Sequence, residues 1–161
     1  MDNLSHIDEK GQAKMVDISS KEDTLRQAVA SGCLRMKPDT ISRIKENSLK
    51  KGDVMAVARI AGIMAAKKAP ELIPLCHPIK LDSVSIDFEY EAEDILKVKA
   101  TVKSRGPTGV EMEALTAVAA AALTVYDMVK AIDRGMTIEK IYLESKQGGK
   151  SGEYKRTREN K

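Results

Sequence analysis

Residues 81–103, LDSVSIDFEYEAEDILKVKATVK, decide the fold that this sequence predicts. Apolar and polar side chains alternate along residues 81–90, with one slip near Asp82, and they alternate again along residues 95–103. Such alternation is typical of strands that bury one face. The short polar segment 92–94 between them is suited to a turn. The stretch therefore predicts a β-hairpin with one face against a core.

The chain before the hairpin predicts a strand and two helices. Residues 24–36 are ambiguous, because apolar residues recur there both at every fourth position and at alternate positions. Gly32 and the β-rich composition favour a strand. Pro38 begins a helix that ends by Leu49. A second helix occupies residues 52–68 and ends in lysines, which the helix dipole favours.

The chain after the hairpin predicts a loop, a helix and a last strand. Residues 106–109 predict a loop, residues 111–130 the strongest helix of the sequence, and residues 136–143 a last strand. Alternating strands and helices in this order predict a ferredoxin-like βαββαβ sandwich of the α+β class, an antiparallel sheet with helices on one face. The other face of the sheet needs a cover, and in so short a chain we expect another subunit to provide it.

The composition describes a single soluble domain over residues 1–161. Hydrophobic residues make up 42% and charged residues 32%, and 27 Lys and Arg against 24 Asp and Glu leave a net charge of +3. This charge is too small to mark a nucleic-acid binder by itself. Residues 1–14 and 152–161 are polar, and we expect both segments to be flexible.

Aromatic residues make up only 3% of the chain, with no Trp and one Phe. Proteins that hold single-stranded nucleic acid stack its bases on aromatic side chains, and residues 97–103, in a central strand, have none. The sequence therefore excludes nucleic acid as a partner. A base-like ligand would have to be held by polar and aliphatic groups.

The cysteines and the apolar runs indicate a cytoplasmic protein. Cys33 and Cys76 are far apart and lack the spacing of a zinc site, so we expect reduced thiols and no metal. The N-terminus lacks the apolar run of a signal peptide, and the longest apolar run, residues 117–125, is too short for a membrane span. We therefore expect no membrane partner.

One side of the predicted helix 111–130 has charged side chains near both ends and mostly small side chains between them. At about 100° per residue, this side carries Met112, Glu113, Thr116, Ala120, Leu123, Asp127 and Lys130. A mixed face is ordinarily solvated, but the alanine run favours packing against a neighbour. Glu113 and Asp127 are 14 residues apart, which is roughly 21 Å along a helix. They could serve one site only with a long ligand, or if helices of two subunits lie side by side.

Three lysines and a histidine have both structural and functional interpretations. Leu75-Cys76-His77-Pro78 lies among prolines, so His77 is held at a fixed place for either role, while Cys76 is expected to be a small buried group rather than a nucleophile. Lys51 at a helix start opposes the helix dipole, as residues at functional sites can, although an exposed lysine loses little there. Lys146 and Lys150 flank a Gly-Gly pair that could wrap an anion or belong to a solvated tail.

The end of the chain also contains Gly149-Lys150-Ser151, part of the pattern of a P-loop. The full pattern needs glycine at position 144, which is Glu144, and a helix after the serine. The sequence therefore excludes ATP hydrolysis of the Walker type.

Five segments together closely resemble the MoaC family, and the resemblance covers nearly the whole chain. They are Lys51-Gly52-Asp53 with Ala58-Arg59-Ile60-Ala61-Gly62, Leu72-Ile73-Pro74-Leu75-Cys76-His77-Pro78, Thr108-Gly109-Val110-Glu111-Met112-Glu113-Ala114-Leu115, Ala122-Leu123-Thr124-Val125-Tyr126-Asp127-Met128, and Gly148-Gly149-Lys150-Ser151-Gly152. The resemblance implies a lyase of molybdenum cofactor biosynthesis. Its substrate would be 3',8-cyclo-7,8-dihydroguanosine triphosphate, rearranged to cyclic pyranopterin monophosphate with release of pyrophosphate. It implies no cofactor, and a ferredoxin-like homohexamer, a trimer of dimers with sites at subunit interfaces.

The resemblance also implies roles for single residues. Asp127 matches the active-site acid, and Lys51 and Lys130 match lysines implicated in catalysis, since ring opening and pyran formation need proton transfers. The substrate-contacting positions would be Leu75, Cys76, His77, Met112 and Glu113, the last accepting hydrogen bonds from a guanine-like amino edge. Cations for the triphosphate could come from Lys146, Lys150, Arg26 and Lys67. Asp17, Lys21 and Arg26 match the family with less defined roles. A non-catalytic assembly protein would explain the alanine-rich helix, but not a fixed His77 beside these acids and lysines.

Overall fold

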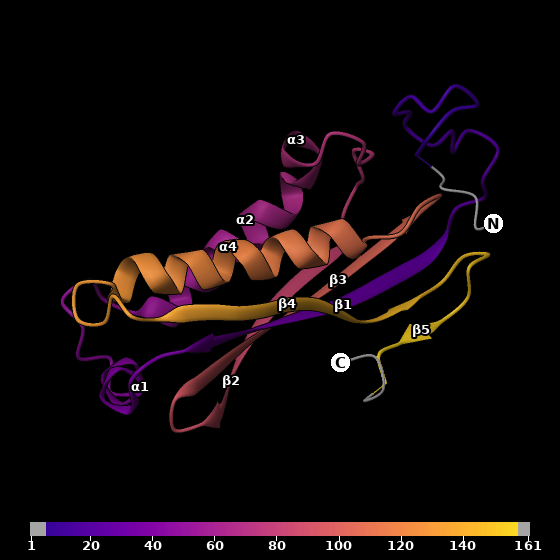
Figure 1. Ribbon diagram of the computed structural model, residues 1–161. Helices are drawn as coiled ribbons and strands as arrows, with labels where there is room; N and C mark the ends of the chain where they lie inside the picture. Colours follow the sequence, from indigo (N-terminus) through magenta and orange to yellow (C-terminus); the bar gives the residue numbers. More distant parts are fainter. Residues whose placement is uncertain (1–5, 158–161) are drawn as a thin grey trace.

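The computed structural model describes residues 6–157, which form one antiparallel sheet with helices packed on it (Figure 1). The strands lie in the order β2-β3-β1-β4-β5. Their bounds are Thr24–Arg35 for β1, Ser83–Ala92 for β2, Ile95–Gly106 for β3, Thr137–Gln147 for β4 and Tyr154–Lys155 for β5. The first four strands have the order and direction of a ferredoxin-like sheet, so this prediction is confirmed.

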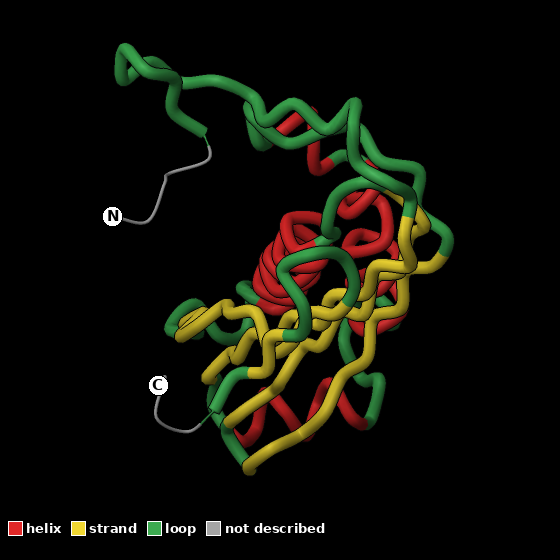
Figure 2. Tube along the Cα trace, turned by 90° about the vertical axis from the view of Figure 1, so that its right-hand side faces the viewer, coloured by secondary structure: helices red, strands yellow, loops and turns green. Residues whose placement is uncertain are grey.

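Two long helices cover one face of the sheet, as Figures 1 and 2 show. The helices are α1 at Pro38–Lys45, α2 at Val54–Lys67, α3 at Ala69–Leu72 and α4 at Glu111–Val129. Neither the short helix α3 nor the two-residue strand β5 was expected. β5 falls within residues 152–161, where its residues pair with Ser145 and Lys146 of β4. The mobility of the two end segments and the single domain over residues 1–161 stay predictions.

The hairpin of β2 and β3 has the alternation that its sequence predicts. Ile86 lies opposite Ala100, and both side chains are buried. The slip near Asp82 arises because this residue precedes the strand. Its carboxylate accepts a hydrogen bond from the Arg105 N–H at 2.8 Å, and its own N–H donates to the Lys103 carbonyl at 2.9 Å. Asp82 therefore holds the beginning of the hairpin rather than continuing its pattern.

The ambiguous segment is the central strand β1, which pairs with β3 on one side and β4 on the other. Ala28, Ala30 and Leu34 are fully buried under the helices. Gly32 lies directly beneath α4, where a Cβ atom would come 2.7 Å from Cγ1 of Val118. The missing side chain lets helix and strand approach closely, so Gly32 serves packing here.

The far face of the sheet is covered by its own polar side chains. Nζ of Lys97 lies 3.3 Å from Oε1 of Glu91 and 3.2 Å from Oε1 of Glu144, and the Ser31 hydroxyl donates to Glu144 at 2.7 Å. Burial opposes the charge of Lys97, but the two carboxylates outweigh it and hold the pKa of Lys97 above its ordinary value. The cover of this face by another subunit stays a prediction. Exposed large apolar side chains lie on both layers, at Leu25 of β1 and Ile141 of β4 in the sheet and at Val57, Ile60, Met64, Leu72 and Leu123 in the helices.

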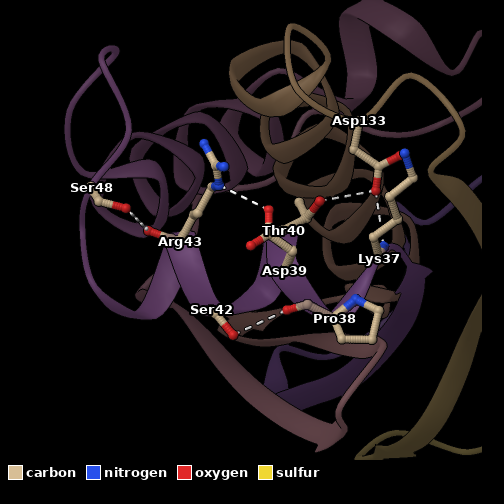
Figure 3. Close-up of polar contacts among 8 residues, drawn as sticks. All are labelled: Lys37, Pro38, Asp39, Thr40, Ser42, Arg43, Ser48 and Asp133. Carbon is tan, nitrogen blue, oxygen red and sulfur yellow. Dashed lines mark hydrogen bonds and ion pairs between the residues drawn. The ribbon is translucent and has the colours of Figure 1, made fainter.

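A buried acid ties the turn after α4 to the beginning of α1 (Figure 3). Asp133 is 2% exposed, and its Oδ2 accepts hydrogen bonds from the Lys37 N–H at 2.9 Å and the Thr40 hydroxyl at 3.1 Å. Burial alone would raise the pKa of Asp133, but these hydrogen bonds outweigh it and lower the pKa. Lys37, the N-cap residue of α1, makes no side-chain cap, so Asp133 supplies the cap from a distant part of the chain.

Helix α4 is long and apolar enough to cross a membrane by length and composition, which the sequence analysis did not anticipate. Half of this stretch is buried inside the fold. Val118, Val125 and Val129 are fully buried in the core that α4 shares with the sheet. These contacts are those of a core helix.

Candidate active site

A cleft of about 900 Å³ lies at the end of the sheet where α4 begins. Its lining brings together predicted residues from distant parts of the chain, namely Lys21, Arg26, His77, Lys146 and Lys150. The loop before α4 also borders the cleft, so the positive end of the helix dipole lies close to it. The cleft is therefore suited to an anion.

Arg26 holds two loops of this cleft in place. Its guanidinium donates from Nε to the carbonyl of Gly106 at 3.1 Å, from Nη2 to that of Pro107 at 3.1 Å, and from Nη1 to that of Gly148 at 3.3 Å. Gly149 has φ +79°, and a Cβ atom there would lie 1.6 Å from Nη1 of Arg26. Only glycine lets the turn wrap the guanidinium this closely. Arg26 thus builds the cleft wall, and its contact with phosphate stays a prediction.

The loop between α3 and β2 carries His77 into the cleft. Nε2 of His77 lies 2.7 Å from the carbonyl oxygen of Val16, which fastens the N-terminal segment to this loop. Asp17, the next residue, lies outside the cleft lining, and its Oδ1 accepts the Ser19 N–H at 2.9 Å. That hydrogen bond lowers the pKa of Asp17. The imidazole is therefore fixed by the N-terminal segment as well as by the prolines.

Cys76 and Glu113 meet behind His77. The Cys76 thiol lies 3.5 Å from Oε1 of Glu113, a residue that is 2% exposed, and Oε2 of Glu113 has no hydrogen-bond partner among the described residues. Burial raises the pKa of the Glu113 carboxyl. Burial and the neighbouring carboxylate raise the pKa of Cys76 to about 11, which agrees with the expectation that Cys76 is not a nucleophile.

Glu113 is buried, although it lies on the side of α4 for which the sequence left open either solvent or packing against a neighbour. Met112, Leu123 and Asp127 are exposed, whereas Glu113 points into the protein. It lies about 60° around the helix from Thr116, at the border between the exposed stripe and the core. There its Oε1 faces the Cys76 thiol of the loop after α3.

A second polar group lies at the other end of α4. Oδ1 of Asp127 accepts a hydrogen bond from Nζ of Lys130 at 2.6 Å, and Nζ of Lys51 donates to the Asp127 carbonyl at 3.0 Å. Nζ of Lys51 also lies 3.8 Å from Oδ2 of Asp127. The hydrogen bond from Lys130 and the charges of both lysines lower the pKa of Asp127. All three side chains are about half exposed or more, so they are accessible to a ligand.

One chain does not bring these two groups together. Figure 1 shows α4 lying along the sheet, with its beginning near the N-terminal segment and its end near α1. The 14 residues between Glu113 and Asp127 span roughly 21 Å of helix. Lys67, at the end of α2, and Leu75 and Met112 also lie outside the cleft lining. Among residues 6–157, no three His, Cys, Asp or Glu side chains form a group that could hold a metal ion.

The cleft also contains residues to which the sequence analysis gave no role. Glu111 lines it, and its Oε1 lies 2.9 Å from Nζ of Lys146. His6 of the N-terminal segment lines it too. Glu111 lies within one of the five recognised segments, but only the fold shows that its side chain reaches Lys146.

Comparison with known proteins decides the family. The sequence model of the MoaC family matches residues 15–149. The chain belongs to the MoaC family. Residues 15–149 contain every predicted site residue except Lys150, so the match spans both polar groups.

Relatives in the MoaC family are similar over nearly their full length. The chain is 57% identical over 155 residues to cyclic pyranopterin monophosphate synthase of Roseiflexus sp. (strain RS-1), covering 96% of this chain and 98% of the relative. It is 55% identical over 157 residues to the synthase of Thermomicrobium roseum, covering 97% and 95%. Cyclic pyranopterin monophosphate synthase 3 of Mycobacterium tuberculosis is 57% identical over 153 residues, covering 95% and 86%.

Proposed function

We propose that this protein is a cyclic pyranopterin monophosphate synthase of molybdenum cofactor biosynthesis. It converts 3',8-cyclo-7,8-dihydroguanosine triphosphate to cyclic pyranopterin monophosphate and pyrophosphate, a lyase reaction carried out in the cytoplasm. One observation carries the proposal: the chain is 57% identical to a relative with this name, and the aligned region covers 98% of that relative. The charged cleft and the exposed Asp127 group support it, because the reaction needs both a triphosphate site and proton transfer.

The cleft at the beginning of α4 takes the triphosphate. Its volume of about 900 Å³ lies within the usual range for ligand sites. Lys21, Lys146 and Lys150 supply positive charge, and Arg26 shapes the wall. In the cyclising step a hydroxyl of the substrate gives its proton to a base as its oxygen bonds to the α-phosphorus, the bond from that phosphorus to the bridging oxygen breaks, and pyrophosphate leaves. Cations around the leaving pyrophosphate stabilise the charge that develops there.

The group of Lys51, Asp127 and Lys130 performs proton transfers during the rearrangement. The lowered pKa of Asp127 keeps it a carboxylate near neutral pH, where it can accept a proton. The lysine ammonium groups beside it can donate protons and stabilise anionic intermediates. An acid, a base and a cation therefore lie within one small group.

We propose that two copies of the chain assemble the complete site through the exposed sides of α2 and α4. On α4 this side carries Met112, Thr116, Ala119, Ala120, Leu123 and Asp127. A two-fold axis between Ala119 and Ala120 would place Met112 of one copy beside Asp127 of the partner copy. The small residues at the axis permit close approach of the helices. Three such dimers would give the hexamer that the family resemblance implies.

The helix beside α4 offers apolar surface for the same contact. α2 carries a groove of about 410 Å³ lined by Ala56, Val57, Ile60, Ala61 and Met64. Val57, Ile60 and Met64 are each roughly half exposed in the single chain. Burying them against a second copy removes apolar area from water, which drives association.

The function is tested by incubating the purified protein with the cyclised nucleotide and measuring pyrophosphate and the pterin product. We expect turnover by the natural protein, and a loss of at least about a hundredfold in Lys51→Ala and in Lys130→Ala. Lys50→Ala is the matched control, because its side chain is exposed beside Lys51 and we expect unchanged activity. Full activity in both Lys51→Ala and Lys130→Ala would remove these lysines from catalysis. No turnover by the natural protein would contradict the proposed function.

A further inference from the structure

An acid occupies the cleft that the proposed function assigns to a triphosphate. Glu111 pairs with Lys146 across 2.9 Å, and both side chains are about seven-tenths buried. Lys146 also lies 3.5 Å from the Ser151 hydroxyl. A carboxylate here opposes an incoming phosphate in two ways, because it holds the cation and because it repels the anion. Its presence therefore needs an explanation beyond anion binding.

The local backbone makes room for this carboxylate. A Cβ atom at Gly109 would lie 2.0 Å from Oε2 of Glu111, so the side chain folds back over a backbone that has no side chain of its own. Glu22 also lines the cleft, but no ion pair joins it to Lys146 within the described chain. The contact of Glu111 with Lys146 is thus a specific feature of the loop before α4.

We propose that Glu111 is a built-in competitor for Lys146 that weakens the hold of the cleft on pyrophosphate and so favours its release. Pyrophosphate reaches Lys146 only when the ion pair with Glu111 breaks, and the freed carboxylate then lies beside the bound anion. Affinity for the leaving group is lowered by both effects. The inference rests on the proposed function for the identity of the anion, while the competition itself depends only on the cleft.

Calorimetric titration with inorganic pyrophosphate in magnesium-free buffer tests this inference. We expect Glu111→Gln to bind pyrophosphate roughly three to ten times more tightly than the natural protein, the size of effect of a partly buried ion pair. Glu22→Gln removes the same charge from the same cleft without touching Lys146, and we expect a clearly smaller gain. In a Lys146→Met background, we expect Glu111→Gln to give only the small gain of Glu22→Gln.

Several outcomes overturn the inference. Equal or weaker binding by Glu111→Gln would show that Glu111 orients Lys146 instead of competing for it. Equal gains in Glu111→Gln and Glu22→Gln would assign the effect to total charge. A repeat with Mg²⁺ in which Glu111→Gln weakens binding would make Glu111 a metal ligand. Turnover is measured separately, so a protein that fails to convert the nucleotide can still show the competition, and a converting protein can still lack it.

Discussion

Cys76 and Glu113 meet where the loop after α3 crosses the first turn of α4, and their contact shows how burial sets the chemistry of single residues. Both groups are less acidic than usual because an ion there would lose its hydration. The thiol therefore stays protonated near neutral pH. Cys76 is suited to packing and weak hydrogen bonding at the edge of the site, not to attack on a substrate.

Alkylation kinetics test the raised pKa of Cys76. In a Cys33→Ala background, we expect the rate with iodoacetamide to lie well below that of a free cysteine at neutral pH and to rise until about pH 11. Cys33→Ala is needed because Cys33 is the other thiol of the chain. We also expect Cys76→Ser to keep most of the activity. An alkylation midpoint at or below the ordinary thiol value would contradict the geometry of the pair.

At the scale of elements, Asp133 is the contact that joins α1 to the end of α4. Its carboxylate caps α1 through a hydrogen bond from Lys37, which lies 96 residues earlier in the chain. The α1–α2 loop that follows carries Lys51, and the helix on the other side carries Asp127. Asp133 therefore stabilises the end of the molecule that holds the proposed proton-transfer group.

We expect Asp133→Ala to lower the free energy of unfolding by about 1–3 kcal/mol, because the Lys37 N–H, the Thr40 hydroxyl and the Gly135 N–H lose their buried acceptor. Asp39→Ala is the control, since Asp39 makes an exposed pair with Arg43 on the same helix (Figure 3) and should cost about 0.5 kcal/mol or less. Urea unfolding of both variants measures the difference. Equal effects of the two variants would contradict the capping role.

The pH dependence of this contribution follows from the lowered pKa of Asp133. Folding favours the ionised carboxylate, so its stabilisation is fully present above the unfolded value of about 4 and is lost as the pH falls through the lower folded value. The difference in stability between the natural protein and Asp133→Ala should therefore shrink in acid. A difference that stays constant from neutral pH into that range would mean that the ionised carboxylate is not what caps α1.

The local pattern of the chain predicted most elements but not the contacts between distant ones. Alternation identified the hairpin of β2 and β3 because each strand buries one face, which is a property of neighbouring residues. For β1 the same pattern was ambiguous, since residues 28–34 of this central strand are buried on both faces of the sheet. The burial of Glu113 could not be predicted either, because it depends on the loop after α3, whose Cys76 contacts this carboxyl.

At the scale of the whole molecule, the two polar groups lie at opposite ends of α4 in every chain. The motifs that carry them could be recognised in the sequence, and the spacing of Glu113 and Asp127 already required either a long ligand or two subunits for a shared site. The surface that we propose for the contact between subunits could not be predicted, because it depends on which helix faces are left exposed. The network around Lys97 lies on the far face of the sheet, whereas α2 and α4 together carry the exposed apolar side chains of Val57, Ile60, Met64 and Leu123.

Mixing two inactive variants tests the shared site most directly. Asp127→Ala lacks the group at one end of α4, and His77→Ala lacks the cleft histidine at the other, so each homodimer has only damaged sites. If the site combines the two ends from different copies, a dimer with one chain of each kind has one intact site. Random exchange of subunits should then restore about a quarter of the natural activity. If mixing restores nothing although mass spectrometry shows mixed dimers, each site lies within one chain and the account is contradicted.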